Sequence, residues 1–115
     1  MPEEDYRAVL LATELPEGAM RAVAIDSREI VLCHSKAGVH ALDNICTHAL
    51  ARMNEGRLRG LRLICPLHGA SFDVRDGRVL GAPATKPLAC HRLRIIDGMI
   101  EVALVDPANK EAATE

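Results

Sequence analysis

The sequence predicts an all-β fold, because short runs of alternating apolar and polar residues recur between compact turns and no segment keeps a helical period for long. The clearest case is the pair of runs at residues 92–96 and 99–104, which flank Asp97-Gly98, a dipeptide favoured in tight hairpin turns. Many short strands with evenly spaced turns are typical of a small sandwich or barrel. At 115 residues the chain has the length of one domain.

Four strands are expected in the first half of the chain, at residues 6–13, 20–25, 27–34 and 38–44. The segments that separate them are rich in turn-forming residues, namely 16–18, Asp26 and 36–38. The segment 47–56 carries Ala, Leu and Met and is expected to make one short helical turn that ends at Gly56.

Two further hairpins are expected in the second half. The first alternates leucine with arginine on both sides of Gly60, and the second joins residues 71–74 to 78–80 through an Asp-Gly turn. The last residues, 106–115, are small and polar, and we expect them to form a flexible tail.

Charge and hydropathy exclude two classes of partner. The chain has 14 basic and 16 acidic residues, a net charge of −2, and its basic residues are dispersed, so neither nucleic acid nor an anionic membrane is indicated. No apolar run approaches the length needed to span a bilayer, and the acidic N-terminus lacks the apolar core of a secretory signal. We therefore expect a cytoplasmic protein.

Two short motifs each pair a cysteine with a histidine: Cys46-Thr-His48 and, sixteen residues later, Cys65-Pro-Leu-His68-Gly69. Two hairpin tips of this kind could hold one metal centre between them. Thiolate ligands select zinc, cuprous copper or iron–sulfur iron, and imidazole suits zinc and iron. A structural zinc finger usually groups its ligands into a Cys pair and a His pair, whereas here each loop mixes the two types, which counts against zinc.

The remaining cysteines and histidines are assigned no function. Cys33 and Cys90 are each followed directly by a histidine, but neighbouring residues on a strand point to opposite faces and do not easily bind one metal. We interpret both cysteines as small apolar residues of a strand face. His34, His40 and His91 are interpreted as ordinary strand histidines, with His40 half exposed.

The two motifs, followed by Phe72-Asp73 and by Gly-Ala-Pro-Ala-Thr-Lys-Pro-Leu at 81–88, resemble the Rieske-type [2Fe–2S] ferredoxins, in particular the ferredoxin components of bacterial aromatic-ring-hydroxylating dioxygenase systems. The resemblance covers nearly the whole chain. It implies the Rieske fold of antiparallel β-sheets across residues 1–105, with a small cluster-binding subdomain at about 44–85 made of two ligand loops.

The resemblance also implies which residues bind the cluster. Cys46 and Cys65 would hold the inner iron, His48 and His68 would hold the outer, solvent-facing iron, and the stretch around Pro83 would close the third side. Two ferric irons and two sulfides carry a formal charge of +2, so two thiolates and two neutral imidazoles bring the oxidised site to zero, whereas four thiolates bring it to −2. The neutral site accepts an electron more easily, in agreement with potentials of about −150 to +300 mV for Rieske centres against about −400 mV for plant-type ferredoxins.

Five positions in and beside the ligand loops predict a low potential within that range. The high-potential respiratory members of the wider family have an additional cysteine in each loop, and a Ser and a Tyr beside the second loop that donate hydrogen bonds to sulfur. This chain has instead Leu50, Ala51, Leu67, Ala70 and Phe72. Fewer donors leave the added electron less stabilised, so we predict a low-potential centre.

The resemblance implies a soluble one-electron carrier of aromatic hydrocarbon catabolism rather than an enzyme. It would pass electrons from a ferredoxin reductase to a terminal Rieske non-haem iron oxygenase, and we expect it to be a monomer. The chain is too short to contain the oxygenase domain itself. Two alternatives stay open: a small Rieske-like subunit of nitrite reductase, and a structural zinc protein.

The surface near the ligand loops suggests two docking hypotheses. Four arginines follow one another between the loops: Arg52, Arg57, Arg59 and Arg62. They could steer an acidic partner, or they could simply form a solvated hairpin face. The apolar residues Leu50, Leu67 and Pro83 could shield the cluster, serve as a small docking surface for a redox partner, or do both.

Overall fold

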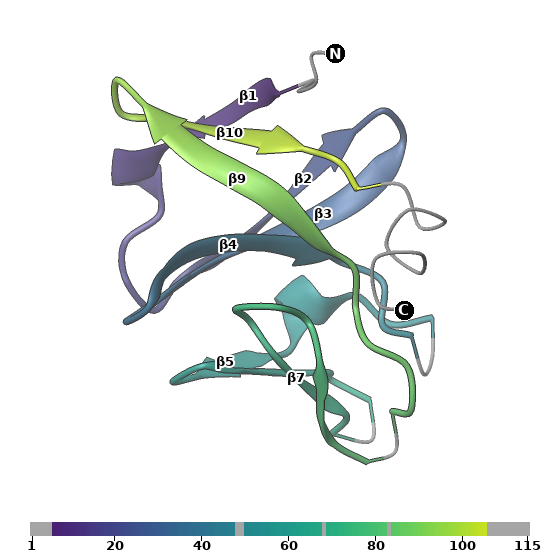
Figure 1. Ribbon diagram of the computed structural model, residues 1–115. Coiled ribbons are helices and arrows are strands. Elements are labelled where there is room, and N and C mark those ends of the chain that lie inside the picture. Colours follow the sequence, from purple (N-terminus) through teal and green to yellow (C-terminus); the bar gives the residue numbers. More distant parts are fainter. Residues whose placement is uncertain (1–5, 48–49, 68, 83, 106–115) are drawn as a thin grey trace.

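Two antiparallel β-sheets make up the protein, and the larger one is folded over on itself (Figure 1), as seen in a computed structural model that describes residues 6–47, 50–67, 69–82 and 84–105. The larger sheet has six strands in the order β1-β10-β9-β4-β3-β2, and the smaller has four in the order β5-β6-β7-β8. In the described part of the chain no helix is long and apolar enough to cross a membrane. The predicted all-β fold is confirmed, and the predicted tail, 106–115, lies outside the described residues.

The smaller sheet is an insertion into the larger one. The larger sheet consists of β1 (Arg7–Leu11), β2 (Met20–Ile25), β3 (Arg28–Ser35), β4 (Gly38–Asp43), β9 (Cys90–Ile96) and β10 (Met99–Ala103). The smaller sheet consists of β5 (Arg57–Arg59), β6 (Arg62–Ile64), β7 (Ser71–Asp73) and β8 (Val79–Gly81). Because β4 pairs directly with β9, the chain leaves the larger sheet, builds the whole smaller sheet and returns to the neighbouring position.

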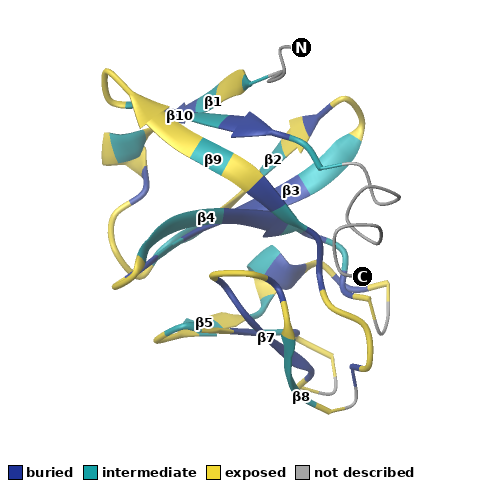
Figure 2. Ribbon diagram, in the orientation of Figure 1, coloured by how far each residue is buried: buried dark blue, intermediate teal, exposed yellow. Residues whose placement is uncertain are grey.

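Strand β3 lies between two hydrophobic cores. Ile30 and Leu32 belong to a core formed within the larger sheet, and Val31 and Cys33 belong to a core that the larger sheet shares with the smaller one. Figure 2 colours this buried stretch of β3 dark blue. All four side chains are 0% exposed. The largest side chains of the shared core are those of Leu42, Met53, Leu63, Phe72 and Leu88. The interior of β3 is therefore buried on both faces. Its side chains fix the position of the smaller sheet against the larger one.

Several strand boundaries differ from the prediction by one or two residues, and two of the differences have a clear local cause. The first strand ends at Leu11, two residues earlier than expected, because a short 3-10 helix, η1 (Ala12–Glu14), begins there. Strand β3 begins at Arg28 because Asp26 and Ser27 both have positive φ angles, 50° and 71°, and form the turn themselves. Sequence reasoning placed Ser27 in the strand because neither turn residue is a glycine.

The connections of the smaller sheet agree more closely with the sequence. The expected helical turn is the 3-10 helix η2 (Met53–Glu55), which ends at Gly56. Gly77, in the Asp-Gly turn between β7 and β8, has a φ of 81°, and a Cβ added there would lie 2.1 Å from the carbonyl oxygen of Leu88. The Leu88 N–H in turn donates to the Gly77 carbonyl oxygen at 2.8 Å. This turn therefore packs directly on the segment that leads back to β9.

Replacing Gly77 by alanine is expected to lower the free energy of unfolding by about 3 kcal/mol or more, because a methyl group there would clash with Leu88 in addition to the cost of a left-handed φ. Gly98 is the matched control, since its φ is 80° but nothing lies within 4 Å of an added Cβ. Gly98→Ala should cost only about 1–2 kcal/mol. Urea unfolding of the two variants measures both values, and equal losses would contradict the clash.

Candidate metal centre

The first ligand loop is a closed hairpin tip. The Cys46 N–H donates to the Ala51 carbonyl oxygen at 2.9 Å, and Ile45 and Arg52 form an antiparallel bridge beside it. Arg52 also makes a bidentate ion pair with Glu29 of β3, through Nε at 2.8 Å and a terminal nitrogen at 3.1 Å. These contacts fasten the loop to the larger sheet.

Asn44, which follows β4, holds the base of the same loop from inside. It is 0% exposed, its Oδ1 accepts from the Asn54 N–H at 2.9 Å, and its Nδ2 donates to Asn54 Oδ1 at 2.8 Å. Its backbone N–H donates to the Glu29 carbonyl oxygen at 2.9 Å, and its carbonyl oxygen accepts from the Met53 N–H at 2.6 Å. Sequence reasoning missed Asn44, although a carboxamide between a strand end and a candidate ligand cysteine is a signal that could have indicated it.

The second ligand loop repeats the closure of the first. The Cys65 N–H donates to the Ala70 carbonyl oxygen at 2.7 Å, and the two residues are five apart, as Cys46 and Ala51 are in the first loop. Gly69 has a φ of 76°, a conformation that glycine adopts without strain. Strand β6 leads into the loop and β7 leads out of it, and the two strands pair. The two cysteines therefore occupy equivalent positions in two loops of the same closure.

These loops bring the thiols of Cys46 and Cys65 together. The residues are 4% and 2% exposed, and their side chains are within hydrogen-bonding distance of each other. Burial raises the pKa of the Cys65 thiol, a hydrogen bond from the Leu67 N–H to the sulfur opposes this, and the neighbouring Cys46 adds to the rise. Two soft sulfur donors in one buried place fit two ligands of an iron–sulfur cluster.

The other predicted site residues, His48, His68 and Pro83, lie outside the described residues. The segment that follows Pro83 does lie beside the first loop, because Thr47 Oγ1 donates to the Lys86 carbonyl oxygen at 2.7 Å. Among the described residues, no group of three or more His, Cys, Asp and Glu side chains is placed to hold a metal ion. The described geometry thus brings together two of the four predicted ligands.

Neither of the other two cysteines belongs to the centre. Cys33 is 0% exposed in the shared core, and burial raises its pKa to about 12, so it is a neutral thiol at pH 7. Cys90 is half-buried, and its Sγ lies 3.6 Å from the Arg75 carbonyl oxygen. None of the four cysteines forms a disulfide. The interpretation of Cys33 as an apolar residue of a strand face is confirmed.

Of the three remaining histidines, His34 and His91 make hydrogen bonds away from the ligand loops, whereas the buried Nδ1 of His40 has no hydrogen-bond partner among the described residues. His34 Nδ1 lies 2.7 Å from a backbone carbonyl oxygen. The His91 side chain is 0% exposed, with Nε2 at 2.8 Å from Asp43 Oδ1 and Nδ1 accepting from the Val105 N–H at 2.9 Å. His40 is half-buried as expected, and burial lowers its pKa. None of the three lies with Cys46 and Cys65 in a group that could hold a metal, as far as the described residues extend.

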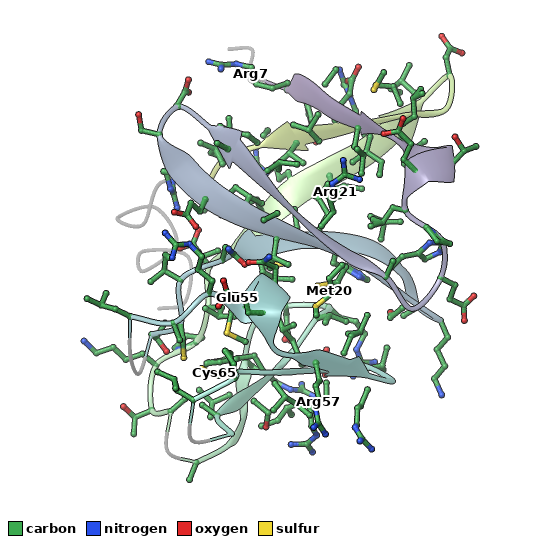
Figure 3. The ribbon with its side chains drawn as sticks, turned by 180° about the vertical axis from the view of Figure 1, so that it is seen from behind. Arg7, Met20, Arg21, Glu55, Arg57 and Cys65 are labelled. Atoms are coloured by element: carbon green, nitrogen blue, oxygen red, sulfur yellow. The ribbon has the colours of Figure 1, made fainter. Side chains whose placement is uncertain are left out.

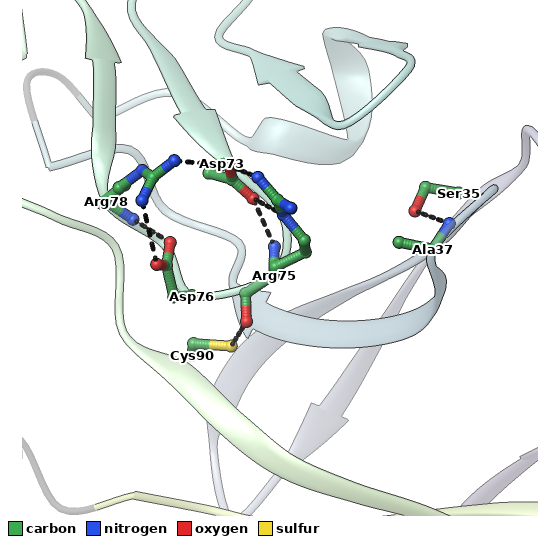
Figure 4. A network of polar contacts seen from close by, with 7 residues as sticks. All are labelled: Ser35, Ala37, Asp73, Arg75, Asp76, Arg78 and Cys90. Carbon is green, nitrogen blue, oxygen red and sulfur yellow. Dashed lines mark hydrogen bonds and ion pairs between the residues drawn. The ribbon is translucent and has the colours of Figure 1, made fainter.

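A buried carboxylate at the end of β7 neutralises two arginines of the smaller sheet. The Asp73 side chain is 3% exposed and accepts from Arg75 Nε at 3.0 Å and from a terminal nitrogen of Arg75 at 2.7 Å, with Arg78 at 3.5 Å (Figure 4). The hydrogen bonds from Arg75 are the main cause that lowers the pKa of Asp73 to about 2. Arg78 also lies 3.8 Å from an Asp76 oxygen. Both arginines are therefore matched by carboxylates.

Known proteins share this fold and these motifs. The Rieske [2Fe–2S] domain matches residues 5–92. The ferredoxin component of the naphthalene 1,2-dioxygenase system of Pseudomonas aeruginosa is 40% identical over 95 residues, which cover 83% of this chain and 90% of that protein. The ferredoxin of carbazole 1,9a-dioxygenase from Nocardioides aromaticivorans IC177 has a TM-score of 0.83 at 28% identity, covering 87% of this chain and 98% of that one. A chain from the complex of reduced oxygenase and oxidised ferredoxin in carbazole 1,9a-dioxygenase has a TM-score of 0.80 at 28% identity, covering 84% and 100%.

An all-β chain in which two equally closed loops bring two buried thiols together has the architecture of an iron–sulfur protein. The chain belongs to the family of Rieske [2Fe–2S] domains, and its cofactor is a Rieske-type [2Fe–2S] cluster. The predicted family, fold class and cofactor are confirmed. The alternative of a structural zinc protein is set aside, because the matched domain is defined by an iron–sulfur cluster.

Replacing Asn44 by alanine is expected to lower the free energy of unfolding by about 1–3 kcal/mol, because the buried Asn54 N–H would lose its acceptor beneath the first loop. Asn54→Ala is the control, since it removes side-chain hydrogen bonding at the same place but leaves the backbone N–H bonded to Asn44. Urea unfolding compares the two. An Asn54→Ala variant as unstable as Asn44→Ala would show that the base of the loop does not depend on this acceptor.

Proposed function

We propose that this chain is the ferredoxin component of a multicomponent aromatic-ring dioxygenase system, a one-electron carrier that accepts electrons from a ferredoxin reductase and donates them to a terminal Rieske non-haem iron oxygenase. The observation that carries the proposal is the pair of equally closed loops whose buried thiols meet, in a chain 40% identical to a naphthalene dioxygenase ferredoxin. The complex of oxygenase and ferredoxin among its structural relatives supports the oxygenase as one partner.

We further propose that Cys46, Cys65, His48 and His68 are the four cluster ligands. The two cysteines are supported by their burial and by the contact between their side chains. Each histidine lies, in the sequence, between the two residues that the closing hydrogen bond of its loop joins. One cysteine and one histidine per loop is the ligand set that distinguishes a Rieske centre from an all-cysteine ferredoxin.

The bound cluster supplies the one-electron redox chemistry, and the chain's own residues control access to it. Ala51 and Ala70, which close the two loops, are buried and keep water from the cysteine thiols. In contrast, Leu50 and Leu67 are 95% and 46% exposed. Weak redox complexes use small interfaces, so these two leucines suit a docking surface beside the cluster.

We propose a low reduction potential because two buried side chains near Cys65 carry no hydrogen-bond donor. Among the described residues, the Leu67 N–H donates to Cys65. Ala70 and Phe72 are both 0% exposed in the shared core, and neither side chain carries a donor. Each missing donor leaves the reduced, more negative state less stabilised, which lowers the potential.

Cys65→Ala is expected to abolish iron and acid-labile sulfide binding, to remove the low-temperature EPR signal of the reduced protein, and to stop electron delivery to the oxygenase. The control is Cys33→Ala, which removes an equally buried thiol from the shared core but not from the loops. It should keep its iron, its sulfide and its spectrum. Electron delivery is measured with the reductase and oxygenase of the Pseudomonas aeruginosa naphthalene system. One zinc and no sulfide in the wild type would contradict the proposal.

The double variant Ala70→Ser with Phe72→Tyr is expected to raise the reduction potential toward the positive part of the range of about −150 to +300 mV, because each substitution adds a hydroxyl donor near the Cys65 loop. Redox titration followed by EPR measures the shift. Thr47→Val is the control. It removes a hydroxyl that donates to the Lys86 carbonyl oxygen and not to sulfur, so the reduction potential should stay unchanged. An unchanged potential in the double variant, with the cluster intact, would refute the hydrogen-bond argument.

A further inference from the structure

Three arginines share one face of the hairpin formed by β5 and β6. Arg57 and Arg59 alternate with Leu58 on β5, and Arg59 lies directly opposite Arg62 in the register. All three are exposed, whereas Leu63 on the other face is buried in the shared core. Arg57 lies opposite Ile64, the residue before Cys65, so the arginine face begins beside a ligand cysteine (Figure 3). We call Arg57, Arg59 and Arg62 the hairpin patch.

Like charges placed directly opposite each other on paired strands destabilise the pair, so the pairing of Arg59 with Arg62 lowers the stability of the hairpin. Neither Arg57 nor Arg59 forms an ion pair with another described residue, and Arg62 bonds to the neutral Ser71 hydroxyl at 2.7 Å. The other arginines of the ligand-loop region differ, because Glu29 pairs with Arg52, and Asp73 with Arg75 and Arg78. Among the described arginines of this region, the uncompensated positive charge is therefore concentrated in the hairpin patch.

The distribution of charge along the chain makes the patch directional. Residues 44–85 contain six arginines and three carboxylates, a formal excess of three positive charges, although the whole chain has a net charge of −2. The end of the molecule that carries the ligand loops is thus basic, and the rest is acidic. Such asymmetry orients a diffusing partner and raises its association rate.

We propose that the hairpin patch docks a carboxylate-rich surface of the reductase, an inference that rests on the proposed function. The reductase meets the oxidised ferredoxin, whose cluster site is formally neutral with two thiolates and two imidazoles. After one electron has moved from the reductase to the ferredoxin, that site carries a charge of −1 and repels nearby carboxylates. An acidic surface therefore binds the form that has to be reduced and releases the product. For the oxygenase, which has to bind the reduced form, the same charges would act in the opposite sense.

The test uses Arg59→Glu and a matched control, Arg21→Glu. The control makes the same change of charge at an exposed position on β2 in the larger sheet (Figure 3). Binding of poly-L-glutamate to each oxidised holoprotein is measured by calorimetry. The rates of reduction by the reductase, and of oxidation by the oxygenase, of the Pseudomonas aeruginosa naphthalene system are measured by stopped flow at low and high salt.

For Arg59→Glu we expect about tenfold weaker poly-L-glutamate binding and about tenfold slower reduction at low ionic strength, with both differences lost near 1 M salt, where the Debye length is about 3 Å. Arg21→Glu should change neither by more than about twofold. Electron transfer to the oxygenase should not slow in either variant. The urea midpoint of Arg59→Glu should not fall, because the introduced carboxylate faces Arg62.

Equal effects of the two substitutions, no poly-L-glutamate binding by the wild type, or an equal slowing of the oxygenase step would each overturn the inference. A wild type that is reduced rapidly but without salt dependence would overturn it while leaving the proposed function intact. A wild type that the reductase does not reduce would overturn both.

Discussion

The whole site depends on one hydrogen bond that is made twice, from the N–H of a cysteine to the carbonyl oxygen five residues later. In the first loop it joins Cys46 to Ala51, and in the second it joins Cys65 to Ala70. Each bond fixes where its cysteine leaves its sheet, and together the two bonds bring the sulfurs to one buried place.

The surface around this site differs in charge and polarity from one part to the next. The arginines near the larger sheet and at the end of β7 are paired with carboxylates, and those of the β5–β6 hairpin are left to solvent. Buried alanine and phenylalanine side chains beside Cys65 withhold hydrogen bonds from the sulfur, while exposed leucines lie in the loops themselves. The same short stretch of chain therefore controls both how readily an electron is accepted and which surface a partner meets.

Much of this architecture was predictable from local patterns. Alternation and Asp-Gly dipeptides predicted two hairpins, of which the one at 97–98 has a two-residue turn and the one that contains 76–77 has a five-residue connection between β7 and β8. A turn was predicted at Asp26, but Ser27 was placed in the following strand, since a non-glycine residue with a positive φ leaves no clear mark in a sequence. The two motifs predicted both ligand loops, but not the role of Asn44, because its hydrogen bonds join segments nine or more residues apart. Nor did sequence show that Arg52 is neutralised while Arg57 and Arg59 are not.

The insertion of the smaller sheet between β4 and β9 has a mechanical consequence. The first loop is fastened to the larger sheet through Glu29, whereas the second loop is an extension of β6 and β7 in the smaller sheet. A cluster held by both cysteines would therefore be a cross-link between the two sheets, as well as a redox group. Such a cross-link would oppose sliding of one sheet against the other, so any local opening that separates the sheets would strain the bonds between iron and the cysteine sulfurs.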